Sequence, residues 1–155
     1  MSIEILTDLK TDYVHVRCTG PFNTNAVLEM WQSAFRIALK EGCKAVLVDV
    51  RGIHGEPPNI SERFDHAVCI AQLQRRFGNQ ILIAVLGNEP MIDPNRLGES
   101  IARSHGAFLG VFTDIGETVN WLKTEVANAR ELEISLQWRS VLKNDYIRSL
   151  KKADI

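Results

Sequence analysis

The stretch KAVLVDVRGIHGEPPNIS, residues 44–61, decides the fold. It opens with a nearly continuous run of apolar, mostly β-branched residues, which is typical of a strand buried in the centre of a parallel sheet. A loop with two glycines and two prolines follows, and a helical pattern begins at Ser61. A buried strand that leads through a loop into a helix predicts an α/β domain.

The residues before this stretch predict two strands and a helix. Residues 3–6 and 13–18 have strand patterns and are close enough in sequence to form a hairpin. In YVHVRC the valines alternate with His15 and Arg17, which predicts a strand with one face in solvent or at an edge. The helix that follows has Thr24 or Asn25 as its N-terminal cap, and it ends at Gly42 in a left-handed conformation.

The residues after the stretch continue the alternation of strand and helix. Because the connections are short, we expect parallel strands with right-handed crossovers. The first hairpin adds one antiparallel strand, so the sequence predicts a five-stranded mixed sheet with flanking helices. The later elements are a helix over 61–77 closed by Gly78, a strand over 80–87, a helix from Asp93-Pro94 to Gly106, a strand over 107–112, and a helix with Asp114 and Glu117 at capping-box spacing.

The C-terminal segment differs from the rest of the chain. Residues 123–155 contain no glycine or proline, so they extend the fourth helix or form a fifth one. We therefore divide the chain into an α/β domain over 1–123 and a helical extension over 124–155. One face of the extension is apolar and must be covered, by the same domain or by a second subunit. This candidate homodimer interface consists of Ile134, Trp138, Val141, Leu142, Tyr146 and Leu150.

Composition limits the class of protein. The 155 residues suffice for one domain, and a net charge of −1 argues against nucleic-acid binding. Three cysteines without a CxxC pair are expected to be buried free thiols, as in a reducing cytoplasm. The first ten residues do not have the pattern of a signal peptide, and no apolar run approaches the ~18 residues of a membrane span. We therefore expect a cytoplasmic protein without an integral membrane segment.

Three stretches resemble the SpoIIAA-like (STAS/Sec14-type) bacterial domain family. They are AVLVDVRGI, ILIAVLGNEP and FLGVFTDIGETVNWL, and the last carries the most specific pattern, T-D-x-x-E-x-x-x-W-L. The resemblance covers residues 3–123. It implies a βα superhelical α/β domain with a mixed sheet. STAS members are mostly regulatory interaction modules, of which anti-sigma-factor antagonists are the best known, and the related Sec14-type fold binds lipids in an apolar pocket.

The chain departs from the family pattern after the central strand. The resemblance implies an Asp-Ser-Ser-Gly-type motif there, in which a serine at a helix start is phosphorylated and the added charge breaks the partner interface. DVRGIHGEPPNIS replaces that motif here. Ser61 remains at the expected helix start, where capping alone explains a serine, and it is the candidate phosphoacceptor.

Two loops form the candidate ligand or partner site. Both leave the carboxyl ends of predicted parallel strands, where open α/β sheets place ligands. If they enclose a pocket, Ile60, Met91 and Ile92 are expected to supply its apolar wall. The candidate residues of the two loops are Arg51, His54, Glu56, Ile60, Met91, Ile92 and Asp93.

The sequence contains no cofactor motif that we accept. The loop after the central strand has neither GxGxxG nor the lysine of a P-loop. His54, Glu62 and His66 match no zinc spacing, so we predict no metal site.

Three functions are left open. The first is a non-catalytic regulatory or binding module that acts through protein–protein interaction as a homodimer with an unknown protein partner. The alternative is a carrier or sensor of a small apolar, lipid-like ligand. The third is a small enzyme that uses His54 with Glu56 or Asp65 as acid and base.

Overall fold

The fold is a five-stranded mixed sheet with helices on both faces. A computed structural model describes residues 2–77 and 81–153. The strands lie in the order β1-β2-β3-β4-β5; β1 and β2 are antiparallel and every other neighbouring pair is parallel, as predicted. The elements are β1 (Glu4–Leu9), β2 (Val14–Pro21), α1 (Thr24–Lys40), β3 (Ala45–His54), α2 (Ile60–Arg76), β4 (Leu82–Leu86), α3 (Leu97–Ser104), β5 (Leu109–Phe112) and α4 (Ile115–Ala153).

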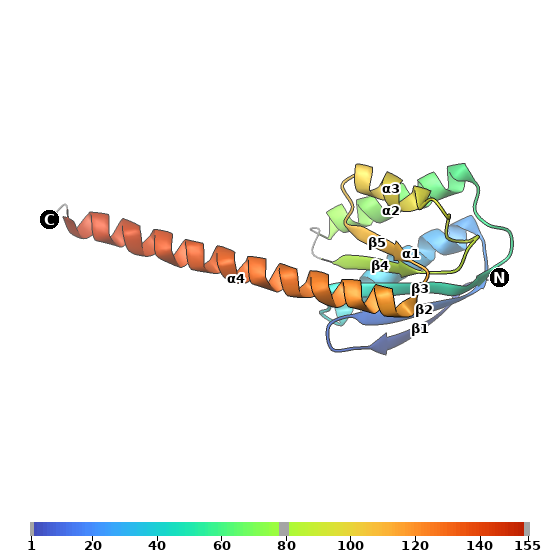
Figure 1. The fold of residues 1–155 in the computed structure, drawn as a ribbon, viewed down its shortest axis with the longest axis horizontal. Coiled ribbons are helices and arrows are strands. Elements are labelled where there is room, and N and C mark those ends of the chain that lie inside the picture. Colours follow the sequence, from blue (N-terminus) through green and yellow to red (C-terminus); the bar gives the residue numbers. More distant parts are fainter. Residues whose placement is uncertain (1, 78–80, 154–155) are drawn as a thin grey trace.

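The strand order explains the layers. Each parallel strand lies beside its predecessor, so three right-handed crossovers place α1, α2 and α3 on the same face of the sheet. The last helix, α4, crosses the opposite face (Figure 1). Side chains of β3 alternate between the two layers: Val46 and Val48 join the core under α1–α3, whereas Ala45 and Leu47 join the core under α4.

The central strand is longer than predicted. We expected a loop from Arg51 onwards, but β3 continues to His54 and pairs with the end of β2. The register between β2 and β3 shifts between Arg17 and Thr19, which is the signature of a bulge. Gly52 permits the close approach, since a Cβ there would lie 2.8 Å from the carbonyl oxygen of Cys18. The glycine therefore marks a bulge within the strand instead of its end.

The first two helices, α1 and α2, are both capped at their N-termini by an asparagine. The amide oxygen of Asn23 accepts from the backbone N–H of Ala26 at 3.1 Å, so neither Thr24 nor Asn25 caps α1. At α2 the N-terminal cap is Asn59, whose side chain and that of Glu62 form a reciprocal capping box. The prediction that Ser61 caps this helix was wrong.

The remaining helix ends give a mixed result. Gly42 adopts a φ of 66°, as predicted for the end of α1. The third helix starts at Leu97 and not at Asp93-Pro94, because Arg96 lies in the left-handed region, with a φ of 54°. The carboxylate of Asp114 accepts from the N–H of Glu117 at 2.8 Å, which fits the predicted start of α4. The predicted closing residue Gly78 lies outside the described residues.

A single helix contains residues 123–153 of the C-terminal segment. The helix α4 runs without a break from Ile115 to Ala153, so the segment extends the fourth helix. Its first half packs on the sheet, and Val126 is its last buried residue. Two ion pairs fasten the helix where it leaves the body: Arg130 with Asp12 at 3.1 Å and Glu133 with Lys44 at 2.8 Å. Residues 131–152 are exposed, and apart from the ion pair of Glu133 they do not pack on their own domain. The prediction that the same domain covers the apolar face of this segment is therefore wrong for the single chain.

Candidate functional site

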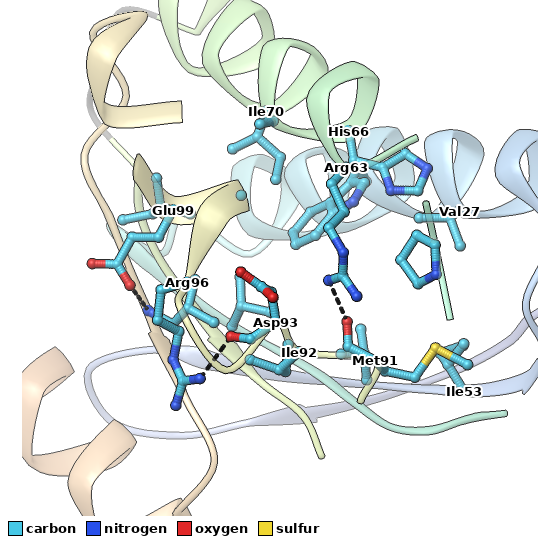
Figure 2. A pocket seen from close by; sticks show the side chains of 18 of the residues that line it. Val27, Ile53, Arg63, His66, Ile70, Met91, Ile92, Asp93, Arg96 and Glu99 are labelled. Atoms are coloured by element: carbon cyan, nitrogen blue, oxygen red, sulfur yellow. Dashed lines mark hydrogen bonds between the residues drawn. The ribbon is translucent and has the colours of Figure 1, made fainter. Parts of the chain in front are cut away.

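A cavity lies under α1–α3 at the carboxyl ends of the parallel strands. Its volume is about 130 Å³. Its floor is the sheet, its sides are α1 and α2, and the segment between β4 and α3 forms part of its rim (Figure 2). The lining is Phe22, Val27, Met30, Trp31, Val50, Ile53, Pro58, Arg63, His66, Ala67, Ile70, Val85, Met91, Ile92, Asp93, Arg96, Gly98, Glu99, Leu109 and Val111.

An arginine of α2 binds the segment between β4 and α3 at the rim of the cavity. Arg63 donates from Nη1 to the carbonyl oxygen of Met91 and from Nη2 to that of Pro90, both at 3.0 Å. Figure 2 shows this side chain reaching from the helix to the segment that carries Met91 and Ile92. Two carbonyl oxygens fixed by one planar guanidinium give the segment a defined position. Arg63 was missed by the sequence analysis, because its role depends on carbonyl groups 27 and 28 residues away.

The acidic groups beside the cavity already have partners. The carboxylate of Asp93 accepts from the N–H of Leu97 at 2.9 Å. Glu99 accepts from the N–H of Val111 at 3.2 Å and pairs with Arg103 at 3.2 Å. These carboxylates fasten the loop and α3, and their negative charge is neutralised or hydrogen-bonded locally.

Two residues that line the cavity each have a side-chain nitrogen without a hydrogen-bond partner among the described residues. These nitrogens are Nε1 of Trp31 and Nε2 of His66, and both are buried. Burial lowers the pKa of His66, and Arg63 adds to this, although Glu62 and Asp65 oppose it. His66 is therefore neutral at pH 7. Its Nε2 and the Nε1 of Trp31 are enclosed by protein atoms.

The predicted loop residues separate into two groups. Met91, Ile92 and Asp93 line the cavity, together with Pro58 from the other loop. Ile60 does not supply its wall, since it is the first residue of α2 and is 73% exposed. The loop after β4 therefore contributes more to the cavity than the loop after β3.

The other three candidates lie away from the cavity. Arg51 and His54 belong to the extended β3, and His54 is exposed. Glu56 lines a separate polar depression between the first turns of α1 and α2, where Thr24 donates to Glu62. The predicted candidates thus do not form one cluster.

The structure does not assemble the acid–base set proposed for an enzyme. Among residues 2–77 and 81–153, His54 makes no hydrogen bond or ion pair with Glu56 or Asp65. Nor do the described residues contain three metal-ligating side chains in one place. Ser61 is exposed in the first turn of α2, and its role as a phosphoacceptor stays a prediction.

A buried polar cluster on the α4 face escaped the sequence analysis. Nε2 of His15 lies 2.9 Å from Oδ2 of Asp49, and Arg51 donates to the same carboxylate from Nε, Nη2 and its backbone N–H. The prediction that His15 faces solvent was wrong, because β2 is an interior strand and Asp49 pairs with the imidazole. An aspartate inside a run of buried apolar residues was the signal that a partner exists.

The cluster fixes the charge of its central residue. Burial alone would raise the pKa of Asp49, but the hydrogen bonds from Arg51 and His15 outweigh it and hold that pKa below its usual value. Asp49 is therefore ionised at neutral pH. Burial, with Asp49 nearby, raises the pKa of Cys18 on the opposite face to about 12, so this thiol is unreactive.

The comparisons with known proteins show the fold. No protein-family model matches the sequence, and no curated protein sequence matches it. An anti-sigma factor antagonist from Mycobacterium paratuberculosis is similar in structure, with a TM-score of 0.53 and 12% identity over 79% of this chain and 95% of that one. The predicted SpoIIAA-like fold is confirmed. At this identity the likeness establishes nothing beyond the fold.

A second solved structure is also similar. It is an uncharacterized protein of the DUF3478 family with a SpoIIAA-like fold, from Shewanella loihica PV-4. The TM-score is 0.47 and the identity is 16%, over 78% of this chain and 94% of that one. In addition, no helix among the described residues is long and apolar enough to cross a membrane.

Proposed function

We propose that this chain is a non-catalytic regulatory or binding module that acts through protein–protein interaction and that its first partner is a second copy of itself. The observation that carries the proposal is the projecting half of α4, residues 131–153, which we call the arm (Figure 1). At 1.5 Å per residue the arm is roughly 35 Å long. Three large side chains on it, Trp138, Leu142 and Tyr146, are 63–65% exposed.

A helix with exposed apolar side chains that packs on nothing is only weakly stable in water. Most helical stability in proteins comes from packing of an apolar face, and an unpacked helix is only marginally stable. Fully burying one Leu or Ile side chain contributes about 1.5–3 kcal/mol. Several such side chains from each of two copies can together exceed the cost of association, which is about 4–15 kcal/mol.

The pattern of the arm fits an antiparallel pair of copies. Five of its exposed apolar residues, Ile134, Trp138, Leu142, Tyr146 and Leu150, recur every four positions and are centred on Leu142. Each lies about 40° further round the helix than the one before it. That residue is also the midpoint of the arm, so a second arm laid antiparallel would end where the body of the first begins.

The charges favour the same orientation. Glu131 lies near the body, beside Glu133, which pairs with Lys44, whereas Lys151 and Lys152 lie near the tip. An antiparallel pair brings acidic and basic ends together, while a parallel pair brings the lysines of both copies side by side.

The mass of the protein in solution tests the proposal. We expect the full chain at tens of micromolar to have twice the monomer mass by size-exclusion chromatography with light scattering. Removal of residues 134–155, which keeps both ion pairs at the base of the arm, should yield a folded monomer. Leu142→Asp should also give a monomer, whereas Asn144→Asp adds the same charge on the opposite side of the helix and should leave the dimer intact. A monomeric full chain would overturn the proposal.

The orientation has its own test. Replacing Lys151 and Lys152 together by alanine should weaken an antiparallel dimer a few-fold, because an attraction is lost. In a parallel dimer the same change would relieve repulsion and tighten association. The sign of the change in dissociation constant therefore decides between the two arrangements.

The proposal includes a compartment and a switch. The cysteines Cys18, Cys43 and Cys69 are free, which fits a reducing cytoplasm. A phosphate on Ser61 would lie in the first turn of α2, where helix N-terminal N–H groups favour negative charge. Binding of a further protein partner should then change in a Ser61→Asp variant, and unaltered partner binding would remove the switch from the proposal.

The second candidate function is a carrier or sensor of a small apolar ligand. The observation that favours it is the cavity under α1–α3, whose walls are mostly apolar and which lies at the carboxyl ends of parallel strands. Native mass spectrometry of the purified protein should show an added mass that is lost on mild activation. This function does not compete with the first, because the cavity and the arm lie on different elements.

A further inference from the structure

We propose that the outer edge of β1 is a second interface, at which two copies of the chain join their sheets by antiparallel pairing of their β1 strands. This interface goes beyond the proposed function, because it lies on the body of the molecule and does not involve the arm. It starts from the strand order: β1 pairs with β2 on one side and with no described strand on the other (Figure 1).

Three residues of β1 direct their main-chain hydrogen-bonding groups to the free side. In an antiparallel pair every second residue bonds to the neighbouring strand. The N–H of Lys10 donates to the carbonyl oxygen of Tyr13 at 2.9 Å, which fixes the phase of this alternation. Because the register with β2 continues from there, the N–H and C=O groups of Ile5, Thr7 and Leu9 point outwards. Such a row of unpaired groups is a template for another strand.

The length and the side chains of β1 leave this edge open. Natural edge strands are often protected by proline, by a bulge or by being very short. The strand β1 has six residues, no proline and no shift in its register, whereas β5 at the other edge has four residues. Two side chains of β1 are also largely exposed, Leu6 by 67% and Leu9 by 57%. The β1 edge is therefore the better candidate for strand pairing.

One antiparallel register uses every outward-facing residue of both copies. If Thr7 lies opposite Thr7 of the second copy, Ile5 lies opposite Leu9, and the three residues of each copy all form main-chain hydrogen bonds. A Thr–Thr pair is among the favourable cross-strand pairs, and the two Ile–Leu pairs beside it bring apolar side chains together.

The same register matches the charges on the other face of the strand. Glu4 lies opposite Lys10 of the second copy, and the symmetry repeats this pair. Opposite charges in directly opposed positions stabilise a strand pair. Within one chain Lys10 pairs with Asp8 at 3.0 Å, and Glu4 forms no ion pair with a described residue. The edge is therefore complementary to itself, which favours a second copy over an unrelated peptide.

The interface is expected to be weak. One pair of short strands buries less than the roughly 1,200 Å² of a stable complex. We expect a dissociation constant of roughly one millimolar. The arm would then dominate at tens of micromolar, and edge pairing would join chains further only at higher concentration.

The first experiment uses the full chain with Leu142→Asp, so that the arm does not contribute. Its mass by sedimentation equilibrium should rise from one copy at tens of micromolar towards two copies at about one millimolar. Adding Thr7→Pro should prevent this rise, since proline removes an outward N–H and no bond to β2. Adding Thr7→Val keeps that N–H and is the matched control.

Charge reversal tests the register. In the same background, Glu4→Lys or Lys10→Glu alone should weaken the association about threefold or more, because like charges then lie opposite one another. An equal mixture of the two variants should restore it, since every lysine then lies opposite a glutamate. Asp65→Lys, at an exposed position of α2, makes the same change in charge as Glu4→Lys and should have no effect.

Amide chemical shifts test the edge with β1 unaltered. In the Leu142→Asp chain, the N–H signals of Ile5, Thr7 and Leu9 should move downfield as the concentration rises, and those of Leu6 and Asp8 should move less. A mass that stays at one copy at about one millimolar would overturn the proposal and leave the edge to a strand of another protein. Association without restoration in the charge mixture would overturn the register. The arm is decided separately, by the mass of the wild-type chain at tens of micromolar.

Discussion

The two faces of the sheet are packed in different ways. On one face the three crossover helices leave a pocket at the carboxyl ends of β3–β5, and the segment before α3 forms part of its rim. On the other face α4 alone seals a small core without a comparable cavity among the described residues. Beyond that core, Asp49 draws His15 and Arg51 into a polar cluster. The two layers on one sheet thus differ, because one contains a pocket and the other a small apolar core and a buried polar cluster.

Truncation of a side chain in the core under α4 should have the largest effect on stability. Leu122 is fully buried where α4 meets the sheet. We expect Leu122→Ala to lower the free energy of unfolding by about 3–5 kcal/mol. Apolar burial is lost, and the surrounding side chains cannot fill the void that the deleted atoms leave. Urea denaturation followed by circular dichroism measures this. Thr124→Ala, on the exposed side of the same helix turn, is the control, and an equal loss there would show that α4 does not seal this face.

Removal of the central carboxylate should have the next largest effect. Asp49→Ala leaves two donors of the cluster without their acceptor and should cost about 3 kcal/mol at pH 7. Asp65→Ala, at an exposed position of α2, should cost less than about 0.5 kcal/mol.

The contribution of this carboxylate should depend on pH with a known sign. The pKa of Asp49 is lower in the folded chain than in the unfolded chain. Its contribution is therefore fully present above the unfolded value of about 3.9 and is lost as the pH falls through the folded value. The difference between the wild-type protein and Asp49→Ala should shrink below about pH 4. A difference that stayed constant to pH 2 would contradict the ionised cluster.

The contrast between the faces also marks what the sequence could predict. Continuous and alternating apolar patterns were enough for the order of strands and the mixed sheet, since they report local burial. The cluster was not predicted, because the partner of Asp49 is 34 residues away on β2. The end of β3 was misplaced for the same reason: Gly52 signals a break locally, and only pairing with β2 turns that break into a bulge.

The cavity illustrates the same limit. Met91 and Ile92 were named because they follow a buried strand, and the structure places them in its wall. The unpaired atoms of Trp31 and His66 could not be predicted from the sequence. An apolar stripe on a helix predicts that a side chain is buried, but it does not show whether its polar atoms find partners.

Two Ala→Leu substitutions, one in each layer, test how much empty space lies on each face of the sheet. Ala84, in β4, is fully buried in the core under α4, and Ala67, in α2, lines the cavity. Ala84→Leu should cost about 1–3 kcal/mol through overpacking. Ala67→Leu should cost less than 1 kcal/mol or stabilise the chain, since the added atoms fill empty space. Equal costs at the two positions would mean that the cavity closes in solution.

The smallest expected effect concerns the first turn of α2, the helix that carries Arg63 and His66 into the cavity layer. Asn59→Ala removes the side-chain acceptor of the capping box and should cost about 1 kcal/mol. Ser61→Ala should change stability by less than about 0.5 kcal/mol, because this exposed hydroxyl does not supply the cap. Thermal unfolding of both variants beside the wild-type protein measures the two costs. The reverse order would restore Ser61 as the cap, whereas the expected order leaves its hydroxyl free of a structural duty and open to modification.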